Sequence, residues 1–395
     1  MLPVRQKTTF STMPAFKSRI ESALAERKTQ GLNRSMNVVF AGNQSVLEHE
    51  GRRYINFSSN DYLGLANDQA LVRAWQQGLS VYGSGSGASP MVTGFSAAHS
   101  NLEAALTEWL GYDRAILFGS GFSANQALLF TLLEKSDVLI QDRLNHASLM
   151  EAGALSPAKM KRFKHNDIEH LKSLINSEDN HLVVTEGVFS MDGDCAPLSD
   201  IAAVVDSHNA WFAVDDAHGI GVLGQSGGGS CELATVKPEI LIVTFGKAFG
   251  MSGAAILCDH ATGDFLTQFA RHHVYSTAMP PAQAYALTHA VSIVQEQSWR
   301  REKLSELSEV YRDCLSDLEG FVETQTSIKP FVIGESELAL QVASACRQNG
   351  IWVTAIRPPT VPKGTSRLRI TLTANHTNEQ VKTLSMALKQ ALGAL

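Results

Sequence analysis

The sequence predicts an α/β protein in which helices flank a mostly parallel central sheet, followed by a smaller C-terminal α+β domain. Short apolar strands alternate with helical stretches between residues 114 and 253, and continuous apolar runs are typical of strands buried on both faces. The chain has 395 residues, which exceeds the usual size of one hydrophobic core. At least two domains are therefore expected.

Residues 1–58 are predicted to form an arm before the main domain. The segment 1–14 is polar and has no apolar run of signal-peptide length. An amphipathic helix is predicted from four apolar residues at helical spacing: Phe16, Ile20, Ala23 and Leu24. Two short strands, 45–47 and 54–57, flank a turn over 48–51 and are expected to pair as a hairpin.

The large domain is predicted over 59–299 and the C-terminal domain over 300–395. The expected strands of the large domain are 115–118, 138–140, 182–185, 211–214 and 241–243. The spacing of these strands leaves room for crossover helices, so they are expected to run parallel, with ligands at their carboxyl ends. The C-terminal domain is expected to begin with a charged helix over 300–318 and to include a strand over 368–372 before a final helix.

Composition favours a cytoplasmic enzyme over a nucleic-acid-binding or membrane protein. The formal net charge is -6, and no stretch of about 18 residues is uninterruptedly apolar. The five cysteines are scattered and form no C-x-x-C pair, so reduced thiols and no metal site are predicted.

Three of the expected strands end in polar residues: 185–187 (TEG), 215–219 (DDAHG) and 244–250 (TFGKAFG). Carboxylates and a histidine at the ends of buried strands carry a desolvation cost unless they meet a partner. A cationic or proton-donating ligand would supply that partner.

Lys247 follows Asp215 by roughly one strand–helix–strand unit, so both can reach one crevice. A partly desolvated amine can condense with a carbonyl, and a lysine with an aspartate is the pairing that pyridoxal phosphate requires. Taken alone, Lys247 is equally well explained as a surface lysine in a glycine-rich loop. Asp215 and His218 at matching strand ends favour the cofactor.

Two glycine-rich segments give different signals. The run 115–125 reads as a strand, a glycine turn and a helix start, where backbone N–H groups attract phosphate, although many glycine turns bind nothing. The run 83–88 (GSGSGA) follows a helical stretch and not a strand, so a dinucleotide site is rejected.

Two further residues have competing interpretations. His146 follows a predicted strand end and could stack on a flat cofactor, although a lone histidine is more often a core or cap residue. In the strand 366–372, alternation places Arg367, Arg369 and Thr371 on one face, so an arginine such as Arg369 could form a fork onto a carboxylate. A solvated strand face is a slightly better interpretation of the alternation alone.

Five segments together resemble the α-oxoamine synthases: 56–64 (NFSSNDYLG), 120–122 (SGF), 185–193 (TEGVFSMDG), 215–219 (DDAHG) and 244–247 (TFGK). These are pyridoxal phosphate enzymes of the aspartate aminotransferase fold, type I. The segments 31–34 and 354–362 narrow the resemblance to members that condense L-alanine with a pimeloyl thioester and release carbon dioxide. The resemblance runs from about residue 16 to the C-terminus.

The resemblance implies a role for each motif residue. Lys247 would form the internal aldimine and then act as general base and acid at the substrate Cα. The other cofactor contacts that it implies are Asp215 at the pyridine nitrogen, His218 at the phenolic oxygen, His146 stacked on the ring, Ser190 near the ring oxygen, and backbone groups of Gly121 and Phe122 with the Thr244 hydroxyl on the phosphate. The implied substrate contacts are Asn60 and Arg369 for the carboxylate and Arg34 and Thr360 for the acyl chain.

The resemblance also implies a homodimer in which Ser276 and Thr277 reach the neighbour's phosphate. Coenzyme A and acyl carrier protein both stay open as the acyl donor. Many relatives carry an arginine within the segment that reads 87–94 here (GASPMVTG), so the role of the 83–94 loop is left open. The alternatives are a sister synthase that uses glycine or serine, such as 2-amino-3-ketobutyrate ligase, and a pyridoxal-binding regulator without turnover.

Overall fold

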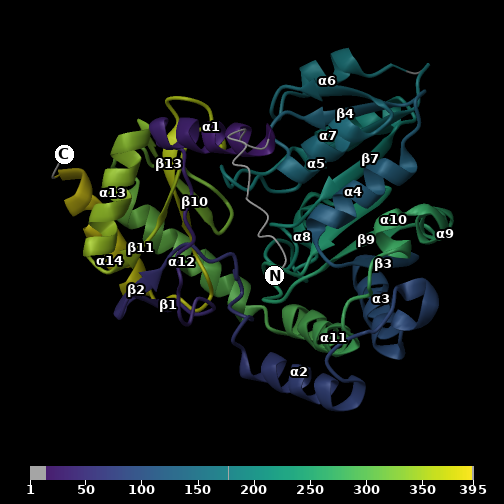
Figure 1. Ribbon diagram of the computed structural model, residues 1–395, viewed down its shortest axis with the longest axis horizontal. Helices are drawn as coiled ribbons and strands as arrows, with labels where there is room; N and C mark the ends of the chain where they lie inside the picture. The colour runs from purple at the N-terminus through teal and green to yellow at the C-terminus, as the bar shows by residue number, and fades with distance from the viewer. Residues whose placement is uncertain (1–14, 177, 394–395) are drawn as a thin grey trace, which may run out of the picture.

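The computed structural model describes residues 15–176 and 178–393. The segment Met1–Pro14, for which the sequence predicts no signal peptide, lies outside the described residues. Figure 1 shows two bodies side by side, a larger one built on a wide sheet and a smaller one that carries the C-terminus. Among the described helices, none combines the length and the apolar character that a membrane crossing needs.

The larger body contains a seven-stranded sheet of order β3-β9-β8-β7-β6-β4-β5, in which β9 runs antiparallel to both neighbours. The predicted mostly parallel sheet and all five predicted strands are confirmed. The strands are β3 (Arg114–Phe118), β4 (Val138–Asp142), β5 (Lys159–Phe163), β6 (His181–Glu186), β7 (Trp211–Asp215), β8 (Ile240–Thr244) and β9 (Ala254–Cys258).

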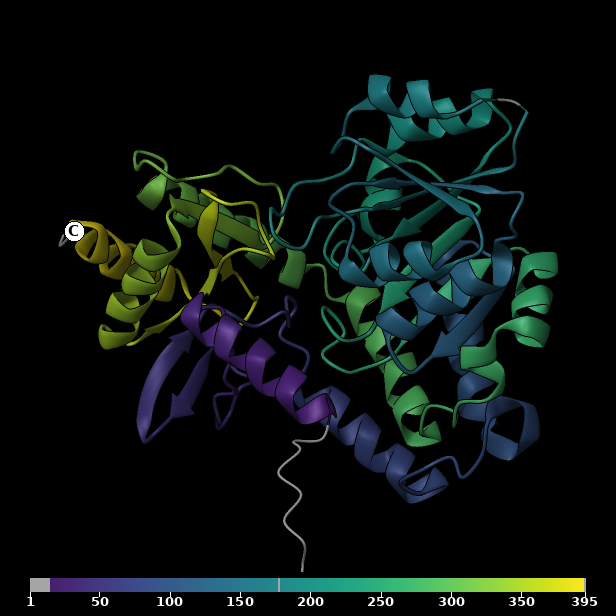
Figure 2. The same ribbon diagram turned by 45° about the horizontal axis from the view of Figure 1, so that its top comes forward.

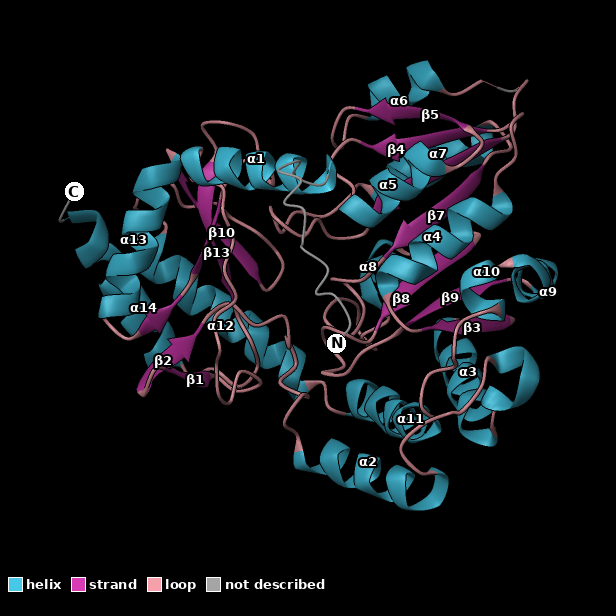
Figure 3. Cartoon of the chain, in the orientation of Figure 1, coloured by secondary structure: helices cyan, strands magenta, loops and turns pink. Residues whose placement is uncertain are grey.

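Helices cover both faces of this sheet, as Figure 3 shows. One face packs against α4 (Gly121–Leu132), α5 (Ala147–Leu155) and α9 (His260–Phe269) through one apolar cluster. The other face packs against α3 (Ala97–Leu110), α7 (Leu198–Ser207) and α11 (Pro281–Glu296) through a second cluster that continues into the smaller body. Burial on both faces explains why these strands are apolar along their whole length.

The smaller body is an antiparallel sheet, β10-β13-β12, with helices against it. The elements of the smaller body are α12 (Trp299–Leu315), β10 (Ile328–Gly334), α13 (Ser336–Gln348), β12 (Thr354–Ile356), β13 (Ser366–Thr371) and α14 (Asn378–Gly393). The predicted charged helix is α12 and the predicted final helix is α14.

The predicted hairpin forms from β1 (Val46–His49) and β2 (Arg52–Asn56). Its two-residue turn, Glu50 and Gly51, has positive φ at both positions, as the twist of a tight hairpin requires. Strand β2 also pairs with β11 (Ile351–Trp352), so the hairpin lies beside the C-terminal body in Figures 1 and 2. The division of the chain at residues 58 and 299 stays a prediction.

The predicted N-terminal helix is confirmed as α1 (Ala15–Thr29). Its apolar side chains are exposed within the single chain, with Phe16 at 67% and Leu24 at 62%. Figure 1 shows α1 beside the smaller body, and α2 (Gln69–Tyr82) lies beneath the larger one.

A buried histidine ties the hairpin to the C-terminal body. The His376 ring stacks on Phe57 at 4.3 Å, its Nδ1 accepts from the Thr373 N–H at 3.1 Å, and its Nε2 donates to the Asn56 carbonyl at 3.0 Å. Burial lowers the pKa of His376 to about 4, although the Asn56 carbonyl opposes this shift. The His376 ring is therefore neutral in the folded protein, with one nitrogen that accepts and one that donates a hydrogen bond.

This histidine is expected to make the protein acid-sensitive. His376 takes up a proton near pH 6.5 in the unfolded chain and only near pH 4 in the folded chain. The contribution of the neutral His376 ring to the free energy of unfolding is therefore complete above pH 6.5 and is lost as the pH falls from 6.5 to 4. At pH 5 the loss is about 2 kcal/mol. Calorimetric melting at pH 7.5 and pH 5 should show a smaller acid shift in Tm for His376→Gln than for wild type, while exposed His289→Gln behaves as wild type. Equal shifts in all three proteins would contradict this assignment.

Candidate active site

A cavity of about 300 Å³ lies at the carboxyl ends of the parallel strands. Strands β6, β7 and β8 are neighbours, and their last residues are Glu186, Asp215 and Thr244. All three line the cavity together with Lys247, so the predicted convergence of strand ends is confirmed. The remaining lining residues are Asn60, Gly119, Ser120, Gly121, Phe122, Asn125, His146, Ser148, Ala217, Gly246, Ser252 and Gly253.

Lys247 lies in the turn that follows β8 and presents a half-buried side chain to the cavity. Desolvation by burial lowers the pKa of its amine, and the charges of Asp215 and Glu186 oppose this shift. A lowered pKa increases the share of neutral amine, which is the nucleophilic and basic form. The chemistry available at Lys247 is therefore condensation with a carbonyl or proton abstraction.

Asp215 is buried and held in one orientation by two donors. Its Oδ2 accepts from Asn125 Nδ2 at 2.7 Å, and its Oδ1 accepts from the Ala217 N–H at 3.0 Å. Asn125 is in turn fixed in α4 by a bond to Ser148 Oγ at 2.9 Å. The sequence predicts no role for Asn125. An amide placed among the apolar residues of a helix is nevertheless a usable signal of a site residue.

His218 is buried and bonds to a fully buried tyrosine. Tyr62 Oη lies 2.6 Å from His218 Nδ1. Burial, together with the charges of Lys247 and Arg369, lowers the pKa of His218 well below its ordinary value. Burial also raises the pKa of Tyr62, so the phenol keeps its proton and can donate to Nδ1, and in that tautomer His218 Nε2 carries the ring proton. Tyr62 is a site residue that the sequence did not assign.

Three buried oxygen atoms of residues that line the cavity have no hydrogen-bond partner among the described residues: Asn125 Oδ1, Glu186 Oε1 and Thr244 Oγ1. Burial raises the pKa of Glu186 well above its ordinary value, and the Asp215 charge adds to this shift. Buried polar atoms without partners are rare in folded proteins. Their position at the cavity indicates that a polar ligand completes the site.

The glycine turn opens α4 into the same cavity. Ser120 caps the helix by accepting from the Ser123 N–H at 3.1 Å. The first N–H groups of a helix have no partner inside it, and they point with the positive end of the helix dipole toward the cavity. A Cβ on Gly121 would lie 2.6 Å from Thr244 Cγ2, so glycine is required for this approach. The helix start and the Thr244 hydroxyl together could hold a phosphate group.

His146 caps a helix and also lines the cavity. Its Nδ1 caps α5 by accepting from the Ser148 N–H at 3.2 Å, and its ring lines the cavity edge-on to Phe122, with centroids 6.5 Å apart. Burial and the Lys247 charge lower its pKa, against the Asp215 charge. The ring is therefore a neutral, oriented wall of the cavity.

The arginines of β13 are buried, so the interpretation of this strand as a solvated face is wrong. Arg369 is 8% exposed and Arg367 is 6% exposed. Arg369 Nε donates to the Ser190 carbonyl at 2.6 Å and its Nη1 donates to Asn60 Oδ1 at 3.0 Å. Arg367 pairs with Asp192. The guanidinium of Arg369 is thus oriented beside Asn60, and further N–H donors remain for a carboxylate ligand.

Seven predicted site residues are not among those that line the cavity within one chain. Three of them lie behind the lining: Arg369 bonds to the lining residue Asn60 and to Ser190, and His218 bonds to Tyr62. The other four are Ser276, Thr277, Arg34 and Thr360. Ser276 and Thr277 are exposed in the loop before α11, beside a small hollow that shares Gly119 with the cavity. Arg34 and Thr360 are exposed and do not line the cavity. Their roles, and those of all the other predicted site residues, stay predictions.

The 83–94 loop follows the helix α2, which agrees with the rejection of a dinucleotide fingerprint. It is tied to the Ser276 loop, because the Ala278 N–H donates to the Ala88 carbonyl at 3.0 Å and Ser86 Oγ donates to the Ala278 carbonyl at 2.5 Å. The two loops therefore form one surface beside the cavity.

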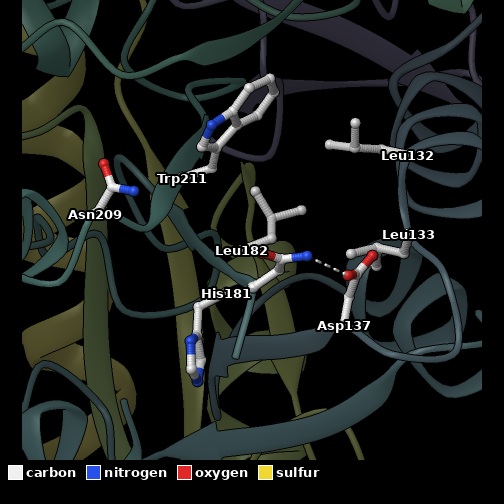
Figure 4. A pocket seen from close by; sticks show the side chains of 8 residues that line it. Leu132, Leu133, Asp137, His181, Leu182, Asn209 and Trp211 are labelled. Carbon is white, nitrogen blue, oxygen red and sulfur yellow. Dashed lines mark hydrogen bonds between the residues drawn. The ribbon is translucent and has the colours of Figure 1, made fainter. Parts of the chain in front are cut away.

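A separate pocket of about 280 Å³, shown in Figure 4, lies at the opposite ends of β6 and β7. Leucines 132, 133 and 182 and Trp211 line it, and Asn180 Nδ2 donates to Asp137 Oδ1 at 3.3 Å. The His181 ring points away from these leucines in Figure 4. The partnerless oxygens and the lysine lie at the other edge of the sheet, so that edge is the candidate site.

Comparisons with known proteins agree with this geometry. Residues 52–388 match the family model described as aminotransferase class I and II. The 8-amino-7-oxononanoate synthase of Vibrio campbellii is 92% identical over 383 residues, covering 97% of this chain and 100% of the relative.

Two solved structures show the same fold. A structure of SPT with pyridoxal phosphate as the internal aldimine has a TM-score of 0.90 at 28% identity, covering 96% of this chain and 99% of that one. The 8-amino-7-oxononanoate synthase of Francisella tularensis has a TM-score of 0.76 at 29% identity, covering 86% of this chain and 98% of that one. The chain therefore belongs to the class I and II aminotransferase family and, within it, to the 8-amino-7-oxononanoate synthases.

Proposed function

We propose that the chain is an acyltransferase of biotin biosynthesis that condenses L-alanine with a pimeloyl thioester. The products are 8-amino-7-oxononanoate, carbon dioxide and the free thiol carrier. The observation that carries the proposal is one cavity that holds an amine of lowered pKa, Lys247, and a fixed buried carboxylate, Asp215, beside the helix start that could hold a phosphate group.

The residues of the cavity fit pyridoxal phosphate. The start of α4 and the partnerless Thr244 hydroxyl suit its phosphate, and the Asp215 carboxylate suits a protonated pyridine nitrogen. His146 suits a flat ring, and the Nε2–H of His218 suits a phenolate oxygen. When bound, pyridoxal phosphate supplies an electron sink for charge that develops at the substrate Cα.

The chain's own residues then perform three tasks. Arg369, oriented by Asn60 and the Ser190 carbonyl, binds the carboxylate of L-alanine. Lys247 in its neutral form takes the α-proton and later returns a proton to the same carbon. Asp215, kept in place by Asn125, provides a fixed negative charge toward the ring nitrogen, which costs no reorganisation during the reaction.

The proposal extends to assembly and location. The enzyme is a cytoplasmic homodimer, and the exposure of Ser276 and Thr277 beside the cavity supports their contact with a neighbour's phosphate. The acyl group arrives on coenzyme A or on acyl carrier protein, and comparing turnover of the two thioesters distinguishes them.

The function is tested by absorption spectra of the purified yellow protein, combined with release of carbon dioxide from carboxyl-labelled L-alanine. Addition of L-alanine should change the visible spectrum, and pimeloyl thioester should then release labelled carbon dioxide. A spectral response to glycine but none to alanine would favour the sister synthase. Spectral binding of alanine without carbon dioxide release from either thioester would favour a regulator without turnover.

Arg369→Lys is expected to raise the KM for L-alanine more than it lowers kcat. Lysine keeps the charge but loses the fork that bonds Asn60 and Ser190 together. Losing a charge-assisted hydrogen bond to the substrate carboxylate corresponds to roughly a 10- to 150-fold rise in KM. The matched control is Arg367→Lys, whose guanidinium pairs with Asp192. Equal effects on KM in both variants would remove Arg369 from the carboxylate site.

A further inference from the structure

His165 lies outside the cavity lining, between two carboxylates. It belongs to the turn between β5 and α6 (Ile168–Leu174). Its Nδ1 lies 3.0 Å from Asp142 Oδ1, and its Nε2 lies 2.7 Å from Asp194 Oδ2. Both ring nitrogens therefore face acceptors, one at the end of β4 and the other in the loop that follows β6.

The Asp142 side of this bridge leads to His146. Asp142 is the fully buried last residue of β4, and its Oδ1 also accepts from the Leu144 N–H at 2.8 Å. Its Oδ2 accepts from the Asn166 N–H at 2.9 Å. Asp142 thus fixes both the His165 turn and the short turn that places His146 at the cavity.

The Asp194 side leads to Arg369. Asp194 belongs to the loop 187–195 that follows β6, and Asn166 Nδ2 strengthens the tie through bonds to Asp194 Oδ2 at 3.0 Å and to the Cys195 carbonyl at 3.2 Å. The same loop contains Ser190, whose carbonyl accepts from Arg369 Nε at 2.6 Å. The loop is therefore held by the His165 turn on one side and by β13 on the other.

The charged form of His165 is the one that can make both bonds. Burial disfavours the charge, but the hydrogen bonds and charges of Asp142 and Asp194 outweigh burial and raise the pKa of His165 to about 10. An imidazolium donates from both nitrogens, whereas a neutral ring donates from one only. The Phe189 ring packs edge-on at 4.4 Å and restricts the rotation of the imidazole.

We propose that His165 is a positioning residue for substrate binding, because its bridge between Asp142 and Asp194 fixes the loop 187–195 and thereby the Ser190 carbonyl that orients Arg369. The inference rests on the proposed function for its substrate, L-alanine. It assigns His165 no contact with substrate or cofactor. Loss of the bridge therefore loosens the Ser190 loop and weakens carboxylate binding, while the groups that transfer protons stay in place.

The test compares wild type with His165→Gln and Asp194→Asn, using His170→Gln as the matched control. His170 lies in the same segment and is also half-buried, but its Nδ1 accepts only from the local Lys164 N–H at 2.8 Å. Hydrogen–deuterium exchange of peptides covering 187–195 should accelerate in both bridge variants and not in the control. The KM for L-alanine should rise roughly tenfold in both, with a smaller change in kcat.

If the hydrogen–deuterium exchange of peptides covering 187–195 is unchanged in both bridge variants, His165 does not hold this loop. Faster exchange with an unchanged KM for L-alanine would overturn the positioning role and leave a purely structural one. If His165→Gln does not fold, Asp194→Asn decides alone, because Asp194 is the more exposed end of the bridge. If wild type itself does not turn over L-alanine, the proposed function fails, while the exchange measurement still decides whether His165 holds the loop.

Discussion

Lys247→Arg is expected to abolish turnover while leaving the fold intact. The amine of Lys247 is the group of lowered pKa at the cavity, and a guanidinium stays charged at any working pH and can neither condense with a carbonyl nor accept a proton. Loss of a general base alone lowers the rate by roughly 10² to 10⁴. The measurement is carbon dioxide release under saturating substrates, alongside the melting temperature and the visible spectrum.

Lys329 provides the matched control for this experiment. It is also a buried lysine, and burial lowers its pKa to about 8, but it lies on β10 and donates to the Thr324 carbonyl at 2.9 Å. Borohydride reduction of wild type followed by peptide mass analysis should place the cofactor on Lys247 and leave Lys329 unmodified. Turnover that survives Lys247→Arg, or label on Lys329, would contradict the assignment.

In the seven-stranded sheet, the sequence predicted five strands that are buried on both faces and missed β5 and β9. Strand β5 lies at the sheet edge, and only Phe163 among its residues is fully buried, so it lacks an apolar run. Strand β9 is apolar but begins ten residues after Thr244 ends β8, too soon for a helical crossover, and it inserts antiparallel between β8 and β3. Pattern alone does not reveal an inserted antiparallel strand.

The site was predictable where strand ends carry the chemistry. Glu186, Asp215 and Lys247 follow apolar runs, and parallel topology then brings them to one edge. Tyr62 was not predictable as the partner of His218, because 156 residues separate them. The Asn125 contact with Asp215 similarly spans 90 residues. Long-range pairs of this kind depend on tertiary packing, which a single sequence does not encode as a local signal.

The buried state of β13 illustrates the same limit. Alternation correctly placed Arg367 and Arg369 on one face, but alternation cannot say what covers that face. The cover is the loop 187–195, which supplies Asp192 to Arg367 and the Ser190 carbonyl to Arg369. A charged strand face is solvated unless another segment brings acceptors to it, and here that segment lies about 175 residues earlier in the chain.

Asp215→Asn is expected to lower kcat by roughly 10² to 10⁴, the range typical of a lost acid–base or preorganised electrostatic contribution. The substitution keeps the shape and removes the charge, so the ring nitrogen loses its anionic partner. Because an amide has one acceptor oxygen, only one of the two bonds from Asn125 Nδ2 and the Ala217 N–H is kept. The carbon dioxide release assay gives kcat, and the visible spectrum on titration with cofactor shows whether binding is retained.

The adjacent carboxylate, Asp216, provides the control for this variant, because it lies in the core and not at the cavity. Asp216 is fully buried and faces away from the cavity, where its Oδ2 accepts from the Ser230 N–H at 2.8 Å and its Oδ1 accepts from Ser230 Oγ at 2.6 Å. Burial raises its pKa to about 7 in spite of these bonds, so its charge near neutral pH is partial and lies in the core. Asp216→Asn should therefore change the melting temperature more than kcat, and the opposite ranking of the two variants would mean that Asp215 is not the cofactor's partner.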